Sequence, residues 1–463
     1  MKPKLSDLWR WDGEVDRGAY LFWGLLLTAI KFNLDRIVFR VWFDTDIHVL
    51  NYFSATGPAA IVTLLESRAQ QLVLLAMALP FLWTGVVLSL RRLRSLKWPL
   101  WMVVMFVVPL LKWFFFVALS ILPRAVEPPP LPGHRAPRWF ERLVPRSMLG
   151  SAVMGVAVST ALAIGATALG AGALRQYGWG LFVGVPFVMG LASVLVHGMR
   201  ERRNLAECML VAVLAAFIAS VGLLAVAFEG IICLVMAAPL AAVLVLFGAM
   251  VGYVIQAGSW RRESGRVMCA AVLAVPVVLG VEKLEQPLAP LLEVTSAVEV
   301  NAPPERVWEH VVTFSELPPP TEFLFRAGVA YPMRAEIHGR GVGAVRHCVF
   351  STGPFVEPIE VWDEPRLLKF AVTQNPAPMQ EWTPYRNIHP PHLDGFLASS
   401  GGQFRLEPLP GGRTRLEGTT WYRHHMWPVG YWQAWSDFII HRIHLRVLNH
   451  VKRLAEETPG PAH

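Results

Sequence analysis

The sequence predicts two kinds of structure in one chain: an α-helical domain that crosses a membrane several times, and then a soluble α+β domain. Three observations support this division. Hydrophobic residues make up 54% of the 463 residues and charged residues only 16%, which is too apolar for an ordinary soluble protein. Long apolar runs occupy the chain up to about residue 290. Beyond it, short alternating segments are separated by turns rich in proline and glycine.

The charge distribution follows the same division. The residues from Leu291 onward carry a net charge of −2, and those before it carry +10. The excess basic residues lie in short loops between apolar runs, such as RRLRSLKW, MRERRN and SWRRESGR. Such loops remain on the cytoplasmic side of a membrane. The basic balance therefore indicates membrane orientation, and we expect no nucleic-acid partner.

The apolar runs predict the membrane spans, since about 20 residues cross the hydrocarbon layer. The predicted segments are Tyr20–Phe43, Leu72–Leu90, Pro99–Leu122, Met148–Leu174, Gly180–His197, Leu205–Phe228, Gly230–Val254 and Arg266–Val281. In the first, Lys31 and Asp35 are four residues apart, so they share a helix face and partly neutralise each other. Basic loops flank Pro99–Leu122 on both sides, and we expect this segment to enter and return as a hairpin.

These segments give the predicted domain bounds. They are a membrane domain over residues 1–122, a linker rich in Pro and Arg over 123–147, a second helical membrane domain over 148–284, and the soluble domain over 291–458. If the last span crosses the bilayer, as we expect, the soluble domain is extracytoplasmic. Glu229 lies beside Gly230 at a predicted hairpin turn, where we expect a carboxylate at the level of the lipid headgroups.

Small residues recur at every fourth position of the Met148–Leu174 span. They are Ser151, Gly155, Ser159, Ala163, Thr167 and Ala171. Side chains four residues apart lie on one face of a helix, and a face of small residues lets a neighbouring helix approach closely. This face therefore predicts helix packing.

The N-terminal part resembles a known family. The segments WRWDGEVDRGAYL and RRLRSLKWPLW are similar to a bacterial inner-membrane family of unknown function that has an RRLHD-type loop before a Trp. Arg94 and Ser95 stand where that family has His and Asp. The resemblance covers residues 8–122. It implies a multi-pass protein of the bacterial inner membrane and carries no activity.

The soluble domain begins with an alternating strand, Thr295–Val300. Asn301 is expected to cap a following helix that starts at Pro303 or Pro304. The apolar stripe of this helix is Val307, Trp308 and Val311. Further strands are predicted at Arg334–Arg340, Ala344–Ser351, Phe355–Trp362, Leu367–Thr373, Gly402–Glu407 and Arg413–His424. A long helix from Trp427 or Pro428 to about Ala455 follows.

This order of elements, with VEVNAPPERVWEHV at its start and EPIEVWDEPRLLKF in its middle, resembles the START-like helix-grip superfamily (SRPBCC). That group includes polyketide cyclase/dehydrase and lipid-transport domains. The resemblance covers Leu291 to Glu457. It implies a curved antiparallel sheet around the last helix and a cavity for an apolar ligand. The implied partners are a lipid or another hydrophobic small molecule and the membrane; no cofactor is expected, and protein partners stay open.

Alternation along the strands predicts which side chains line that cavity, if charged residues face solvent. An exposed Arg346 would turn Val345, His347 and Val349 inward. The last helix carries an apolar stripe of Trp435, Ile439, Ile443 and Val447, flanked by Trp432. The predicted ligand-binding residues are Val345, His347, Val349, Phe370, Phe404, Leu406, Thr420, Tyr422, His424, Trp432, Trp435 and Ile439.

Eleven of the fourteen histidines lie in the soluble domain. His347, Tyr422 and His424 are the candidates for catalysis if they meet in an apolar pocket, where they could act as acid and base. They could equally orient the polar head of a ligand. Spacings typical of an activated nucleophile are absent from the sequence, so whether the protein is an enzyme stays open.

Two further groups of histidines have simpler interpretations. The sequence His389-Pro-Pro-His392-Leu-Asp394 could hold a divalent ion. However, adjacent prolines favour an extended segment whose side chains need not converge, and we expect no metal. Asp437, His441 and His444 share a face of the last helix, which is typical of surface ion pairing.

The function predicted from the sequence is a membrane-tethered domain that binds or transfers a lipid or another hydrophobic small molecule. Such a ligand partitions into the bilayer, which gives the tether a purpose. One alternative is an enzyme of the polyketide cyclase/dehydratase kind. Another is a sensor or assembly module that regulates the membrane domain.

Overall fold

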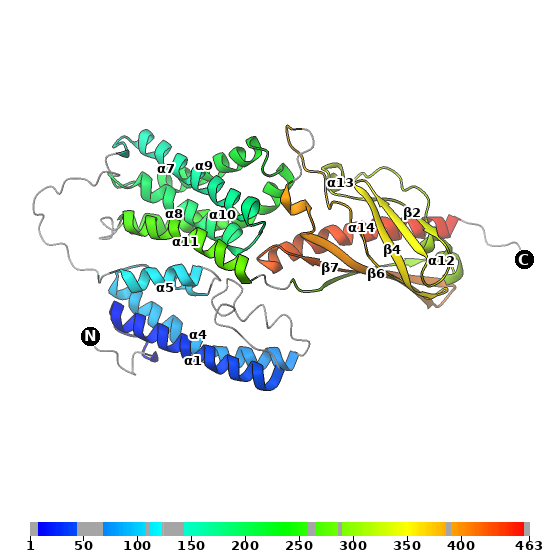
Figure 1. Ribbon diagram of the computed structural model, residues 1–463, viewed down its shortest axis with the longest axis horizontal. Helices are drawn as coiled ribbons and strands as arrows, with labels where there is room; N and C mark the ends of the chain where they lie inside the picture. Colours follow the sequence, from blue (N-terminus) through cyan, green and yellow to red (C-terminus); the bar gives the residue numbers. More distant parts are fainter. Residues whose placement is uncertain are drawn as a thin grey trace, which may run out of the picture. The chain divides into compact units, whose positions relative to one another are not determined.

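The computed structural model describes residues 8–43, 68–107, 111–122, 124, 143–257, 264–285, 289–385 and 390–457. The chain forms two compact units. The first consists of Met1–Ala225 and Ala237–Pro287, and the second of Val226–Met236 and Leu288–His463. The second unit therefore contains the chain that leads into a long apolar helix as well as the predicted soluble domain (Figure 1).

The first unit is helical. Its elements are α1 (Arg17–Phe43), α4 (Arg68–Ser95), the 3-10 helix η2 (Leu100–Phe106), α5 (Leu111–Ile121), α7 (Met148–Thr167), the π-helices η3 (Ala168–Ala173) and η4 (Gly180–Gly184), α8 (Val185–His197), α9 (Leu205–Ala225), α10 (Ile231–Ala257) and α11 (Ser264–Glu285). The residues of α10 up to Met236 belong to the second unit. Six helices in the described residues are long and apolar enough to cross a membrane: Leu75–Ser95, Met148–Ala173, Gly180–His197, Leu205–Ala225, Ile231–Ala257 and Ser264–Leu284. This is the composition expected of a membrane protein.

Two of the predicted spans, Tyr20–Phe43 and Pro99–Leu122, differ from a simple apolar helix in the structure. Helix α1 is 27 residues long and is not among those six helices. Its Lys31 Nζ donates to Asp35 Oδ1 at 2.6 Å, which confirms that the two charges neutralise each other. The Pro99–Leu122 segment forms η2 and α5 instead of one long helix. Whether it enters and returns as a hairpin stays a prediction.

The face of small residues on α7 is buried, as predicted, and α7 packs against α8 and α9. Gly155 is the point of closest approach. A Cβ atom there would lie 2.7 Å from the backbone oxygen of Ser193 in α8. Helix α8 is buried along its whole length, so the bundle is built around it.

The second unit contains one seven-stranded antiparallel sheet. Its strands are β1 (Leu292–Val300), β2 (Pro332–His338), β3 (Val345–Phe350), β4 (Gly353–Asp363), β5 (Leu367–Ala371), β6 (Leu397–Leu409) and β7 (Arg413–His424). Their order across the sheet is β1-β7-β6-β5-β4-β3-β2. The helices are α12 (Pro304–Val312), the short α13 (Phe323–Arg326), the 3-10 helix η6 (Pro391–Leu393) and α14 (Val429–Glu457).

Helix α14 contacts β1 at one edge of the sheet and β2 at the other (Figure 1). A flat sheet of seven strands could not touch one helix at both edges, because strands are about 4.8 Å apart. The sheet therefore curls around α14. The main core lies on this concave side and includes the fully buried Leu368, Leu416, Leu448 and Val451. This is the helix-grip fold that the sequence predicts.

Helix α12 agrees with its predicted stripe but not with its predicted cap. Val307, Trp308 and Val311 are buried. The residue before the first turn is Pro303, and no side chain caps the helix. The prediction for Asn301 is wrong, because its backbone N–H donates to Glu456 Oε1 at 2.8 Å and the chain reaches the helix only after Pro303.

Candidate functional site

A cavity of about 150 Å³ lies between the sheet and α14. Side chains from β3 to β7 and from α14 line it, and most of them are apolar. Prominent members are Phe350, Phe355, Phe370, Phe404, Ile439, Ile443 and Val447. The side chains of the helix-grip domain therefore do not fill the space that its curled sheet encloses.

The cavity wall contains a buried ion pair. Arg346 of β3 lies opposite Glu357 of β4 in the sheet, and both side chains face inward. The two residues are only 1% and 5% exposed. Arg346 Nη1 donates to Glu357 Oε2, and Nε donates to the backbone oxygen of Val312 at 3.2 Å. The third nitrogen, Nη2, meets no carboxylate, carbonyl or hydroxyl acceptor among the described residues, and the buried thiol of Cys348 is the other polar group that interacts with the guanidinium.

Aromatic rings surround the same guanidinium. The Cζ atom of Arg346 lies 5.5 Å from the ring centroids of Phe314 and Phe404 and 5.6 Å from that of Phe370. Rings at this distance attract a cation through their negative faces. Burial opposes the charge of Arg346, but Glu357 and Cys348 together outweigh it and raise the pKa of the guanidinium. Burial also raises the pKa of Glu357, whereas the charge of Arg346 opposes that shift.

The position of Arg346 corrects the prediction for β3. Arg346 and Cys348 are buried and line the cavity, so Val345, His347 and Val349 lie on the opposite face of the strand. The prediction was wrong because it assigned every charged side chain to solvent. A buried carboxylate on the next strand supplies the counter-charge, so the charged side chain can remain inside.

Two histidines of α14 contact hydroxyl groups of β1 and β7. His444 Nε2 bonds with Thr420 Oγ1 at 2.8 Å, and its Nδ1 is 3.1 Å from Ser296 Oγ. The same hydroxyl is 2.7 Å from His441 Nδ1. These contacts correct the prediction of surface ion pairing, because strand hydroxyls instead of opposite charges meet the two imidazoles.

Burial, aided by the neighbouring His441, lowers the pKa of His444 to about 4. His444 is therefore neutral at pH 7. The third member of the predicted surface group, Asp437, accepts a hydrogen bond from Tyr422 at 2.5 Å. Burial and this carboxylate raise the pKa of Tyr422 above its ordinary value.

The three candidates for catalysis do not converge. Tyr422 lines the cavity, and the ring of His424 is 6.3 Å from its ring. His424 is fully buried and does not line the cavity; burial lowers its pKa to about 4. His347 lies on the other face of the sheet, with its ring 5.4 Å from that of His338.

The structure separates the predicted ligand-binding residues into two groups. Those at the cavity wall are Phe370, Phe404, Thr420, Tyr422 and Ile439. Those elsewhere are Val345, His347, Val349, Leu406, His424, Trp432 and Trp435. Leu406 and Trp432 are core residues, at 2% and 1% exposed.

The sequence-based prediction missed Arg346, Glu357 and His444 as cavity residues. For His444 a signal existed, since it lies four residues from both Ile440 and Leu448, and all three line the cavity. The aromatic side chains of the segment Thr321–Gly328 differ in exposure, since Phe325 is buried in the core and Phe323 is 76% exposed.

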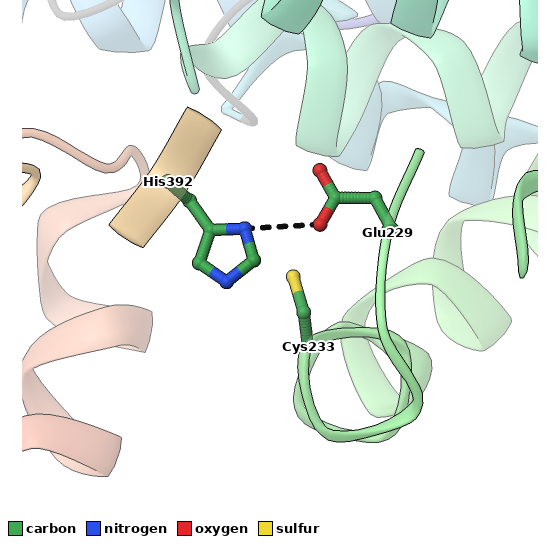
Figure 2. Close-up of side chains that lie close together, drawn as sticks. All are labelled: Glu229, Cys233 and His392. Atoms are coloured by element: carbon green, nitrogen blue, oxygen red, sulfur yellow. Dashed lines mark ion pairs between the residues drawn. The ribbon is translucent and has the colours of Figure 1, made fainter. Parts of the chain in front are cut away.

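A second buried polar cluster lies elsewhere in the same unit. Figure 2 shows Glu229 before α10, Cys233 in the first turn of α10 and His392 in η6 directed toward one another. His392 Nδ1 is 3.0 Å from Glu229 Oε2, and Nε2 is 3.3 Å from Glu381 Oε1. Glu229 is 4% exposed, so the prediction of a carboxylate at headgroup level is wrong.

Glu381 connects this cluster to the start of α10. Its Oε2 accepts from the backbone N–H of Ile232 at 3.0 Å, and Oε1 accepts from that of Cys233 at 3.1 Å. Carboxylates are favourable at this end of a helix, where backbone N–H groups lack partners. Burial acts to lower the pKa of His392, but Glu229 and Glu381 outweigh it and raise that pKa to about 9.

The predicted ligand set His389, His392 and Asp394 is not the group that the structure brings together. His389 lies outside the described residues. Asp394 is exposed, whereas His392 is buried. The partners of His392 come from 163 and 11 residues earlier in the chain, so no local motif could have identified them.

Comparison with known proteins agrees with the fold. Residues 292–437 match the family described as polyketide cyclase / dehydrase and lipid transport. The match does not extend to the N-terminal part, so the resemblance of residues 8–122 stays a prediction. No curated protein matches the chain.

Solved structures that match the chain include the protein XoxI from Bacillus cereus, at 16% identity and a TM-score of 0.24, covering 36% of this chain and 96% of that one. A truncated norcoclaurine synthase from Thalictrum flavum has 13% identity and a TM-score of 0.25, with 37% and 97% covered. The Zhui aromatase/cyclase from Streptomyces sp. R1128 has 16% identity and a TM-score of 0.24, with 36% and 94% covered. From its own sheet and helix, the C-terminal part of this chain is a helix-grip domain, and residues 292–437 of it match the model of the polyketide cyclase / dehydrase and lipid transport family.

Proposed function

We propose that the helix-grip domain binds a compact hydrophobic molecule that carries an anionic or hydrogen-bond-accepting group. The observation that carries this proposal is the unpartnered Nη2 of Arg346, buried in the wall of an otherwise mostly apolar cavity. A buried donor without a partner costs about 1–3 kcal/mol. A bound carboxylate, phenolate or carbonyl oxygen would recover that free energy, and the aromatic rings around the guanidinium would contact the rest of the ligand.

The cavity volume limits the ligand. An apolar cavity of about 150 Å³ in another protein binds benzene, so one aromatic ring or a comparably compact group fits the enclosed space. A larger lipid would have to leave most of its apolar part outside. The apolar helices of the first unit support a role in which the ligand partitions into a membrane and is taken up from it.

Acid–base catalysis in the same cavity is the second candidate function, and His444 is the residue that favours it. His444 lines the cavity and is neutral at pH 7. A general base works best when its pKa is close to the working pH, and a pKa of about 4 makes His444 a weak base. Binding is therefore the function that the electrostatics of the site support better.

The test uses the full-length protein in detergent and two probes of one ring, benzoate and toluene. We expect Arg346→Lys to weaken benzoate binding by about tenfold or more, since lysine keeps a cation beside Glu357 but loses the free Nη2 donor. Toluene binding should change much less. The matched control is Arg340→Lys, because Arg340 pairs with Glu364 at 2.9 Å on the surface. Equal benzoate affinity in Arg346→Lys and the wild type would disprove the proposal.

A further inference from the structure

We propose that Glu229, Cys233 and His392 form a binding site for a divalent transition-metal ion of the zinc class. One possible ligand atom from each residue, a carboxylate oxygen, the Sγ atom and an imidazole nitrogen, lies within 4.8 Å of the other two (Figure 2). All three residues are buried. Thiolate, imidazole and carboxylate are the three ligand types that zinc uses in proteins.

The spacing requires little rearrangement. Zinc bonds of about 2.0–2.3 Å in a tetrahedron separate the ligand atoms by roughly 3.3–3.8 Å. His392 Nδ1 and Glu229 Oε2 are 3.0 Å apart, and no pair in the group exceeds 4.8 Å. Shifts of about an ångström or less would thus place all three around one ion. Glu229 and Cys233 are four residues apart, so the start of α10 presents both on one side.

Glu381 supplies the outer support that such sites have. A metal-bound histidine usually donates its other N–H to a carboxylate, which fixes the orientation of the ring. If Nδ1 of His392 binds the ion, Nε2 faces Glu381 Oε1 at 3.3 Å in that role. Glu381 is itself held by the backbone N–H groups of Ile232 and Cys233. Gly230 makes room for it, because a Cβ there would lie 2.1 Å from Glu381 Oε2.

A divalent ion also suits the charge of the cluster. With Cys233 as thiolate and His392 neutral, Cys233, Glu229 and Glu381 carry −3 in total, so a divalent ion reduces the buried charge to −1, and the backbone N–H groups that bind Glu381 at the start of α10 stabilise what remains. Binding of the ion displaces the protons of Cys233 and His392. The ion would join the start of α10, which holds Cys233, to η6, which holds His392 and follows strands β1 to β5 in the chain. A bridge that closes a long loop of chain stabilises the folded state. The site would therefore fix the start of the apolar helix α10 to the helix-grip domain.

The test uses Co²⁺ as the probe, added to the full-length protein in detergent after removal of metal with a chelator. We expect one Co²⁺ per chain and a near-ultraviolet sulfur-to-cobalt charge-transfer band. Zn²⁺ should displace the Co²⁺ and should raise the unfolding temperature of the protein. A wild-type protein that gives no such band would overturn the proposal, and the three residues would then form a histidine–carboxylate ion pair beside a thiol.

Variants locate the site. Cys233→Ser, which is nearly isosteric, and His392→Gln should both lose the band, whereas Cys269→Ser, at the exposed cysteine of α11, should keep it. Glu381→Gln should keep the band but weaken Co²⁺ binding by about 10- to 100-fold, as other outer-sphere changes do. Circular dichroism confirms that each variant is folded. A band that persists in folded Cys233→Ser would also overturn the assignment.

Discussion

The two units of this protein are packed in opposite ways. In the helical bundle, α7 approaches α8 through small residues, and a single added methyl group at Gly155 would collide with the backbone of its neighbour. In the helix-grip domain, large side chains surround a cavity and a buried ion pair. The packing of the bundle therefore requires small side chains where its helices meet. The packing of the helix-grip domain instead requires that its buried charges be paired.

The largest loss of stability is expected from a substitution that removes one charge of the buried pair. Glu357→Ala removes the counter-charge of Arg346 and leaves the guanidinium buried, so we expect the free energy of unfolding to fall by about 3–5 kcal/mol. The double variant Arg346→Met, Glu357→Leu should recover most of this loss, since it removes both charges. Thermal unfolding of the full-length protein in detergent measures both. If Glu357→Ala were as stable as the wild type, the pair would not control the stability of the domain.

A smaller effect is expected in the bundle. Gly155→Leu should destabilise the packing of α7 on α8 by about 1–3 kcal/mol, because the side chain would overlap the backbone of Ser193. Gly165→Leu on the same helix is the matched control, since nothing lies within 4 Å of a Cβ there. It should be neutral or slightly stabilising, because glycine is unfavourable in a helix interior. Resistance to detergent-induced unfolding compares the two. Similar losses in both variants would contradict close packing at Gly155.

The third effect is a pH dependence of the stability of the helix-grip domain. His424 and His444 have folded pKa values of about 4, below the ordinary value of about 6.5, because both are buried. The unfolded chain therefore binds more protons between these values. Stability from these residues is complete above pH 6.5 and is lost as the pH falls toward 4, by at most about 1.4 kcal/mol per pH unit for each histidine.

His444→Gln isolates this contribution, since glutamine can still bond with Thr420 but does not titrate. The slope of unfolding free energy against pH between 6.5 and 4 should be smaller in this variant than in the wild type. Equal slopes would contradict the lowered pKa, because they would mean that His444 binds protons equally well in the folded and the unfolded chain.

Periodicity predicted the elements of the soluble domain well. The bounds of β7 agree with the predicted strand Arg413–His424, and α14 ends within two residues of the predicted position. Along β5 and β7, Phe370, Thr420 and Tyr422 were correctly predicted to face the cavity. These strands carry apolar or neutral residues on one face and charged ones on the other, so the pattern is unambiguous.

The same rule failed on β3, where the charged residue is the buried one. Alternation identifies the two faces of a strand but cannot say which is inside when a charge has a partner on another strand. That partner, Glu357, became identifiable only when the register of β3 and β4 was known. The prediction for Glu229 failed in a similar way, because Glu381 and His392 reach it from distant parts of the chain.

The sequence by itself determined the division into apolar helices and a helix-grip domain, and the order and type of nearly all its elements. These follow from hydrophobic periodicity and turn residues, which act over a few positions. Only the tertiary structure decided where the buried charges lie, how large the cavity is, and which residues meet at the start of α10. Those features depend on pairs of side chains brought together by the fold, and the free energy of burying a charge depends on its partner.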